Sequence, residues 1–191
     1  LALLHRLVYA RDDEFYSEHT QDPESTLGMM VSGGTLGNVA ALWCARNRCF
    51  APRGNFAGVE QDGLAAALQE YGARRALVIG SSLMHYSLRK AVGLLGLGER
   101  NLIGLKPTPQ GRLDVDLLAK TIRERSAAGD RVMAIIGIAG TTETGAVDPL
   151  EELAALASQT GIHLHIDAAW GGPTLFSARH AHLLAGIEQA D

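Results

Sequence analysis

The sequence is poor in several features that mark specialised protein classes. Only 5% of its 191 residues are aromatic, and only two are cysteines, Cys44 and Cys49. Two cysteines can form only one disulfide bond, which is too few to hold together a chain of this size. Their spacing also differs from the Cys-x-x-Cys pattern of redox and zinc sites. This cysteine usage favours a reduced, cytoplasmic compartment.

Long apolar runs and an excess of positive charge are also missing. No apolar stretch approaches the roughly 20 residues that cross a bilayer, and the opening Leu1–Leu4 meets His5 and Arg6 at once, unlike the core of a secretory signal. The formal net charge is −4. We therefore expect neither a membrane protein nor a nucleic-acid-binding surface. Because the chain does not begin with methionine, we expect it to be part of a longer protein.

The apolar content of 47% is sufficient for one substantial core. Short apolar runs alternate with segments of helical periodicity. The runs that we predict to be strands are Leu27–Val31, Ala76–Ile79, Leu102–Leu105, Val132–Ile138 and Ile162–Ile166. The predicted helices cover residues 39–50, 62–71, 86–95, 114–128, a segment starting at 148–149, and 178–189. This alternation predicts an α/β domain with a mostly parallel sheet and helices on both faces.

The N-terminal part has a different pattern. Leu3–His19 has the periodicity of one amphipathic helix, and a polar, proline-containing segment follows it. We therefore divide the chain into an N-terminal helix and linker, residues 1–26, and the α/β domain, residues 27–191. Within that domain we expect Asp114 to cap a helix and Trp43 to pack in the core.

In a parallel sheet, ligands collect beyond the carboxyl ends of the strands. There Ser32-Gly33-Gly34-Thr35 opens a helix, and free backbone N–H groups, glycines and a hydroxyl suit a phosphate. An ordinary strand-to-helix turn is the alternative interpretation. The segment matches neither the dinucleotide fingerprint nor the P-loop, so the spacing favours a monophosphate.

Three further groups are expected at the same edge. Asp167 ends an apolar strand, His85 follows the second strand, and Thr142 follows the central strand. Each alone is more often structural: an ion pair, a satisfied histidine or a turn. Together with the phosphate-binding turn, a carboxylate and a planar imidazole describe a pocket for pyridoxal phosphate (PLP), whose protonated pyridine nitrogen needs an acidic partner.

A metal site is the competing interpretation of the same strand. His163, His165 and Asp167 alternate and therefore share one face of the sheet. A His-x-His-x-Asp string occurs in the metal sites of metallo-β-lactamase-type hydrolases. However, Ala168 stands where that pattern continues with histidine, and a metal site leaves the glycine-rich turns unexplained.

Four segments resemble, in the same order, the group II PLP-dependent amino-acid decarboxylases: residues 28–38, 84–91, 139–149 and 165–172. The resemblance implies an incomplete large domain of the aspartate-aminotransferase type (fold type I), PLP as cofactor, an amino acid as small-molecule substrate and a homodimer. The amino-acid sequences of the second and third segments are most similar to those of decarboxylases of glutamate, aspartate and 2,4-diaminobutyrate.

The resemblance also assigns roles to single residues. Gly34 and Thr35 would bind the cofactor phosphate. His85 would stack on the pyridine ring, and Ala169 would pack against its other face. Asp167 would pair with the ring nitrogen, and Thr142 would lie near the ring or the substrate carboxylate.

The chain departs from the family pattern in its lysines. The family's Schiff-base lysine lies in a His-Lys pair after the next strand, and the sequence ends at Asp191. Lys90, Lys106 and Lys120, its three lysines, do not occupy that place. We therefore expect the C-terminal small domain to be absent and these 191 residues alone to be inactive. A non-catalytic binding or dimerisation module is the remaining alternative.

Overall fold

A computed structural model describes all residues from Leu1 to Asp191 and centres on one sheet. Its strands are β1 (Ala76–Ser81), β2 (Leu102–Leu105), β3 (Arg131–Ile138) and β4 (His163–Asp167). They follow the order β2-β1-β3-β4, and every neighbouring pair is parallel. The expected α/β class with a parallel sheet is confirmed, and four of the five predicted strands are present.

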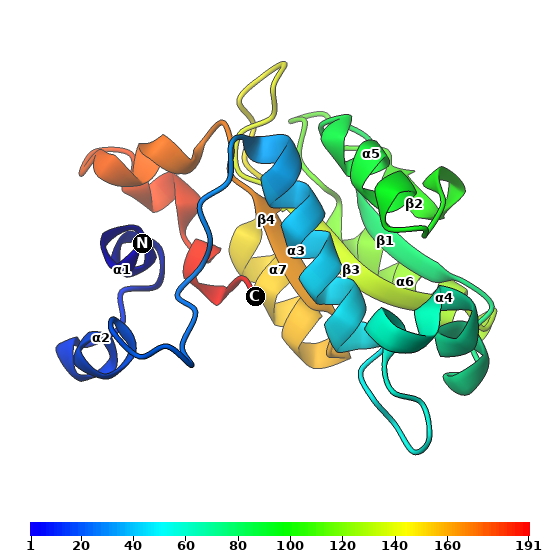
Figure 1. The fold of residues 1–191 in the computed structure, drawn as a ribbon. Coiled ribbons are helices and arrows are strands. Elements are labelled where there is room, and N and C mark those ends of the chain that lie inside the picture. The colour runs from blue at the N-terminus through cyan, green and yellow to red at the C-terminus, as the bar shows by residue number, and fades with distance from the viewer.

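Helices cover both faces of this sheet (Figure 1). One face carries α3 (Gly34–Cys49), α4 (Val59–Glu70) and α5 (Ser87–Leu94). The other face carries α6 (Val115–Ala127) and α7 (Leu150–Thr160). As predicted, Asp114 caps α6: its side chain accepts a hydrogen bond from the Leu117 N–H.

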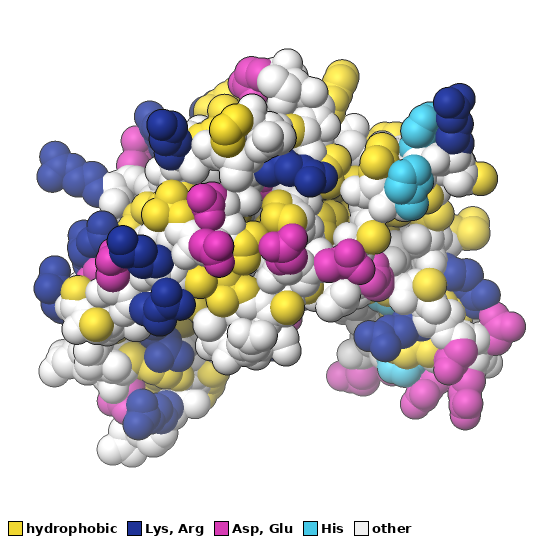
Figure 2. All heavy atoms as spheres, turned by 180° about the vertical axis from the view of Figure 1, so that it is seen from behind, with side chains coloured by type: hydrophobic (Ala, Val, Ile, Leu, Met, Phe, Trp, Pro, Cys, Tyr) yellow, Lys and Arg dark blue, Asp and Glu magenta, His cyan; other side chains and the backbone are white.

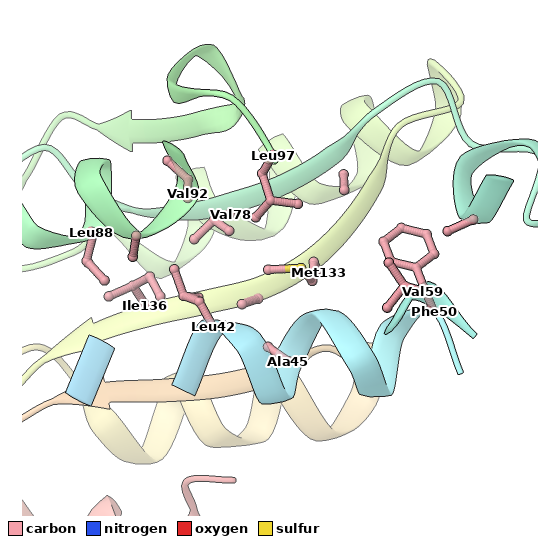
Figure 3. Packing of buried hydrophobic residues seen from close by; sticks show 14 of the residues in the cluster. Leu42, Ala45, Phe50, Val59, Val78, Leu88, Val92, Leu97, Met133 and Ile136 are labelled. Atoms are coloured by element: carbon pink, nitrogen blue, oxygen red, sulfur yellow. The ribbon is translucent and has the colours of Figure 1, made fainter. Parts of the chain in front are cut away.

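The period-2 geometry of a strand explains the two cores. In β1, Ala76 and Val78 point to the α3 side, whereas Leu77 and Ile79 point to the α6 and α7 side. Both sets are buried, which is why the strand is apolar throughout. Figure 3 shows the first core, in which Leu42 of α3 and Met133 of β3 are fully buried.

Three N-terminal predictions are wrong. Residues 3–19 form two helices, α1 (Ala2–Tyr9) and α2 (Asp13–His19), because Ala10 adopts a left-handed conformation and Asp12 caps α2. Figure 1 shows both helices to one side of the sheet. The run 27–31 pairs with no strand, and Met30 in it is 74% exposed. Trp43 is not in the core, since it lies on the outer face of α3.

The C-terminal prediction is also wrong in detail. Residues 178–189 do not form one helix, and the chain from residue 172 folds into three short 3-10 helices: η2 (Gly172–Phe176), η3 (Ala181–Leu184) and η4 (Ile187–Gln189). Gly186, with a φ of 93°, separates the last two, a conformation that a continuous helix cannot accommodate. A further 3-10 turn, η1 (Glu99–Asn101), precedes β2.

The surface mixes charges of both signs. On the face shown in Figure 2, Lys and Arg side chains and Asp and Glu side chains are both present, with apolar side chains among them. No helix combines the length and the apolar character needed to cross a membrane.

Candidate functional site

A pocket of about 250 Å³ lies where the carboxyl ends of β3 and β4 meet the N-terminus of α3. All six residues that the sequence assigned to the site line this pocket: Gly34, Thr35, His85, Thr142, Asp167 and Ala169. The other lining residues are Asn38, Leu83, Ile138, Gly140, Thr141 and Trp170. The structure therefore brings the expected groups together, from segments up to 135 residues apart in the chain (34 to 169).

The first wall of the pocket is the N-terminus of α3. No side chain caps this helix, and the backbone N–H groups of Gly34, Thr35 and Leu36 have no acceptor within the chain. Unpaired N–H groups at the positive end of a helix dipole suit an anion. A Cβ atom at position 34 would lie 3.0 Å from the Ala169 Cβ, so a residue without a side chain lets the helix approach the β4 segment closely.

Two turns that pack backbone against backbone form the second wall. Gly140 has a φ of +98°, and a Cβ atom built on Gly171 would overlap the carbonyl oxygen of Ala139. Thr141 braces the first turn, since its Oγ1 lies 2.7 Å from the Thr144 Oγ1 and accepts from the Ala146 N–H at 3.1 Å. Thr142 at the turn is exposed and free to contact a ligand.

Asp167 ends β4 with its carboxylate at the pocket. Oδ1 accepts from the Ala169 N–H at 3.2 Å, and Oδ2 accepts from the Asn38 Nδ2 at 2.9 Å. No Lys, Arg or His side chain forms an ion pair with it. Each carboxylate oxygen can accept a further hydrogen bond, so the arrangement suits a protonated ring nitrogen.

Sequence reasoning missed two polar residues around Asp167 and His85, Asn38 and Ser87, and considered the third, His165, only as a metal ligand. Asn38 is 3% exposed, and its Nδ2 also donates to the Ser87 Oγ at 2.8 Å. The Ser87 Oγ lies 2.8 Å from the His85 Nδ1, and the His165 Nε2 lies 2.6 Å from the Asn38 Oδ1. One signal was available: Asn38 follows Gly34 by four residues, so both lie on the same face of α3.

His165 completes this network as a neutral side chain. Burial lowers the pKa of His165 to about 4, although the nearby Asp167 carboxylate acts to raise it. At neutral pH the ring therefore carries a single proton. Since the Asn38 Oδ1 can only accept, that proton lies on Nε2.

The structure gives no support to the metal interpretation. No group of three or more His, Cys, Asp or Glu side chains is arranged to hold a metal ion. The His165 Nε2 is occupied by Asn38, and the His163 Nδ1 lies 3.7 Å from the Asp191 Oδ2, away from the pocket. None of the three lysines lines the pocket either.

Fold and site together describe an α/β domain in which a helix N-terminus with free N–H groups and a carboxylate line the same pocket. Residues 14–191 match the model of the pyridoxal-dependent decarboxylase conserved domain, and the chain belongs to this family. The large domain is of fold type I, present here in part, and the cofactor of the family is PLP. The free N–H groups of α3 suit the phosphate of that cofactor, and the Asp167 carboxylate, which accepts two hydrogen bonds but forms no ion pair, suits its protonated ring nitrogen.

Individual relatives agree with this assignment. The chain is 44% identical over its whole length to the aspartate 1-decarboxylase of Aliivibrio fischeri, of which it covers 35%. It is 33% identical to the L-2,4-diaminobutyrate decarboxylase of Acinetobacter baumannii, with 86% of this chain and 32% of that protein covered. The crystal structure of mouse CSAD superposes with a TM-score of 0.81 at 30% identity, over 99% of this chain and 34% of that one. The chain thus spans about a third of the length of these relatives.

Proposed function

We propose that the protein containing this chain decarboxylates an L-amino acid with PLP held in the pocket between α3 and β4. One observation carries the proposal: the unpaired N–H groups of the α3 N-terminus and the Asp167 carboxylate line the same pocket. The free N–H groups suit the phosphate group of PLP, and the carboxylate suits its protonated ring nitrogen. The two features together therefore point to PLP more specifically than either does alone.

In this proposal, the residues of the chain bind PLP and orient its ring. Bound PLP supplies an electron-withdrawing pyridinium ring that stabilises the charge left when the carboxylate of the substrate departs. Asp167 keeps the proton on the ring nitrogen. The α3 N-terminus and the Thr35 hydroxyl hold the phosphate, while His85 and Ala169 fix the plane of the ring. Thr142, exposed at its turn, is left to contact the ring or the substrate carboxylate.

We assign the substrate to the acidic or diamino class, and the assembly to a homodimer. The printed activities of the relatives in Aliivibrio fischeri and Acinetobacter baumannii support the first point. The second is supported by large apolar side chains left uncovered in the pocket lining and in the segment before α3. Met30 is 74% and Trp170 is 70% exposed in a single chain.

Replacing Asp167 by alanine in the full-length protein tests the proposal. We expect the variant to retain part of its PLP but to lose at least about 100-fold in CO2 release, since a lost charge-assisted contact of about 3 kcal/mol corresponds to that factor. CO2 release is measured with L-aspartate, L-glutamate and L-2,4-diaminobutyrate, and bound PLP by its visible absorption.

Asp116→Ala is the matched control, because Asp116 is exposed on α6, on the opposite face of the sheet from α3. It should leave both readouts unchanged. Equal turnover of the Asp167 variant and the wild type would contradict the role of Asp167. PLP binding by the wild type without CO2 release from any amino acid would favour the non-catalytic alternative.

A further inference from the structure

A chain of buried and partly buried hydrogen bonds connects the two sides of the pocket. It runs from His85 through Ser87 to Asn38, and from there to Asp167 on one side and to His165 on the other. Ser87 is fully buried and Asn38 is 3% exposed. Polar groups that are this well shielded from water are costly unless every donor and acceptor is used, so the pattern of donors constrains the whole chain.

The amide of Asn38 has one possible orientation. Its two Nδ2 hydrogens donate to the Ser87 Oγ and to the Asp167 Oδ2, and its Oδ1 accepts from His165. A rotated amide would place Oδ1 against a carboxylate oxygen, acceptor facing acceptor. Asn38 therefore uses both hydrogens and its oxygen, and a residue of the same shape without the Nδ2 donors cannot replace it.

The orientation of Asn38 in turn fixes the proton on His85. The Ser87 Oγ accepts from Asn38, so its own hydrogen is free to donate to the His85 Nδ1 at 2.8 Å. The backbone N–H of Ser87, which can only donate, lies 3.3 Å from the same nitrogen. Two donors face Nδ1, so this atom carries no proton. The ring proton lies on Nε2, which has no hydrogen-bond partner within the chain.

We propose that Asn38 is a positioning residue that sets the Asp167 carboxylate and, through Ser87, the tautomer and orientation of the His85 imidazole. This proposal rests on the proposed function in one respect only: the ring that Asp167 and His85 contact is taken to be the pyridine ring of PLP. It explains why a polar residue lies in the otherwise apolar buried face of α3, beside Leu42 and Ala45.

Ring-nitrogen NMR shifts of the full-length apoprotein, labelled with ¹⁵N-histidine, test the first half. The His85 signals are identified by their loss in His85→Gln. In the wild type we expect Nδ1 to have the shift of an unprotonated acceptor and Nε2 that of an N–H group. In Ser87→Ala the shorter of the two contacts to Nδ1 is lost and only the backbone N–H at 3.3 Å remains, so both shifts should move part of the way toward the average of the two tautomers. A proton on Nδ1 in the wild type, or unchanged shifts in Ser87→Ala, would overturn the proposal.

Titration of the same apoprotein with PLP tests the second half. Asn38→Asp keeps the acceptor for His165 but sets an oxygen against Asp167, so its Kd for PLP should rise about tenfold or more. Asn47→Asp is the control, since Asn47 lies on the same helix and accepts only from Arg46. Its Kd for PLP should stay within about twofold of the wild-type value. The tenfold rise expected for Asn38→Asp, which corresponds to about 1.4 kcal/mol, is well above that range. An equal Kd for Asn38→Asp and Asn47→Asp would overturn the positioning role.

Two measurements keep the outcomes distinct. If circular dichroism shows that Asn38→Asp does not fold, Ser87→Ala decides the question, since it removes one hydroxyl and leaves the Asn38–Asp167 contact in place. If the wild type does not bind PLP, the proposed function fails, but the His85 shifts still decide whether the hydrogen-bond chain sets the tautomer.

Discussion

At the residue scale, the two adjacent glycines after β4 have different importance. A Cβ atom at Gly171 would overlap the carbonyl oxygen of Ala139, whereas one at Gly172 would lie at an ordinary 3.6 Å from the Ala168 Cβ. Gly171→Ala must therefore separate the two turns that form the pocket wall. We expect it to cost about 1–3 kcal/mol of stability, as overpacking does. We also expect it to weaken PLP binding in the full-length protein.

Gly172→Ala provides the comparison, as it adds the same methyl group one residue further along the chain. Thermal unfolding midpoints and the Kd for PLP are measured for both variants. Gly171→Ala should be impaired in both quantities and Gly172→Ala in neither. Equal behaviour of the two variants would show that the close approach of Gly171 to Ala139 is not needed.

The residues of the site differ in how far sequence could predict them. Gly34, Thr35 and Asp167 lie in segments with recognisable chemistry, and the parallel sheet brings such segments to one edge. Asn38 and Ser87 have no such signature. Their importance depends on contacts with residues 49 to 129 positions away, which only the packing of α3 against α5 and β4 creates.

At the element scale, an ion pair joins the amino ends of β1 and β3. Asp130, whose side chain is fully shielded from solvent, accepts from the Arg75 Nε at 3.0 Å and from its Nη2 at 2.7 Å. The hydrogen bonds from Arg75 hold the pKa of Asp130 below its usual range, although desolvation opposes them. Backbone bonds from Arg131 to Arg75 and from Arg74 to Gly129 reinforce the junction.

This pKa shift predicts a pH-dependent loss of stability. A carboxyl group with a lowered pKa in the folded state stabilises the protein above its unfolded pKa of about 3.9, and the contribution is lost as the pH falls through the folded value. The unfolding midpoint of Asp130→Asn should therefore lie below that of the wild type at neutral pH, and the gap should close in acid. Asp116→Asn is the control, because Asp116 is exposed on α6. A gap that persists undiminished at pH values well below 3.9 would contradict the assignment.

Helices and strands could be predicted where the apolar periodicity was strong. They could not be predicted where the backbone conformation of a single residue ends a helix. β3 is buried along nearly its whole length, and its prediction was wrong by only one residue at its start. In residues 3–19 the periodicity continues through a break that the backbone of Ala10 makes. Residues 178–189 have helical spacing, but Gly186 and the packing of η4 against α1 and α7 favour short 3-10 turns.

At the scale of the whole molecule, the outer side of α3 has large apolar side chains that neither the sheet nor the other helices cover. Leu36 is 50% and Trp43 is 49% exposed, and the two lie seven residues apart on one face of the helix. Met29 and Met30, 63% and 74% exposed, precede the same helix. Monomeric proteins seldom expose several large apolar side chains along one helix and the segment before it, so we expect a partner surface to cover them in the full-length protein.

Expression of residues 1–191 alone tests this expectation, because in that polypeptide nothing but another copy can cover the outer side of α3. We expect self-association that increases with concentration, measured by analytical ultracentrifugation. Trp43→Glu should weaken it, because a charge placed in an apolar contact must be desolvated without a partner. Leu94→Glu is the control, since Leu94 is 75% exposed at the end of α5, on a different helix. If both variants associate as the wild type does, the contact does not involve α3, and the homodimer of the proposed function must use another face.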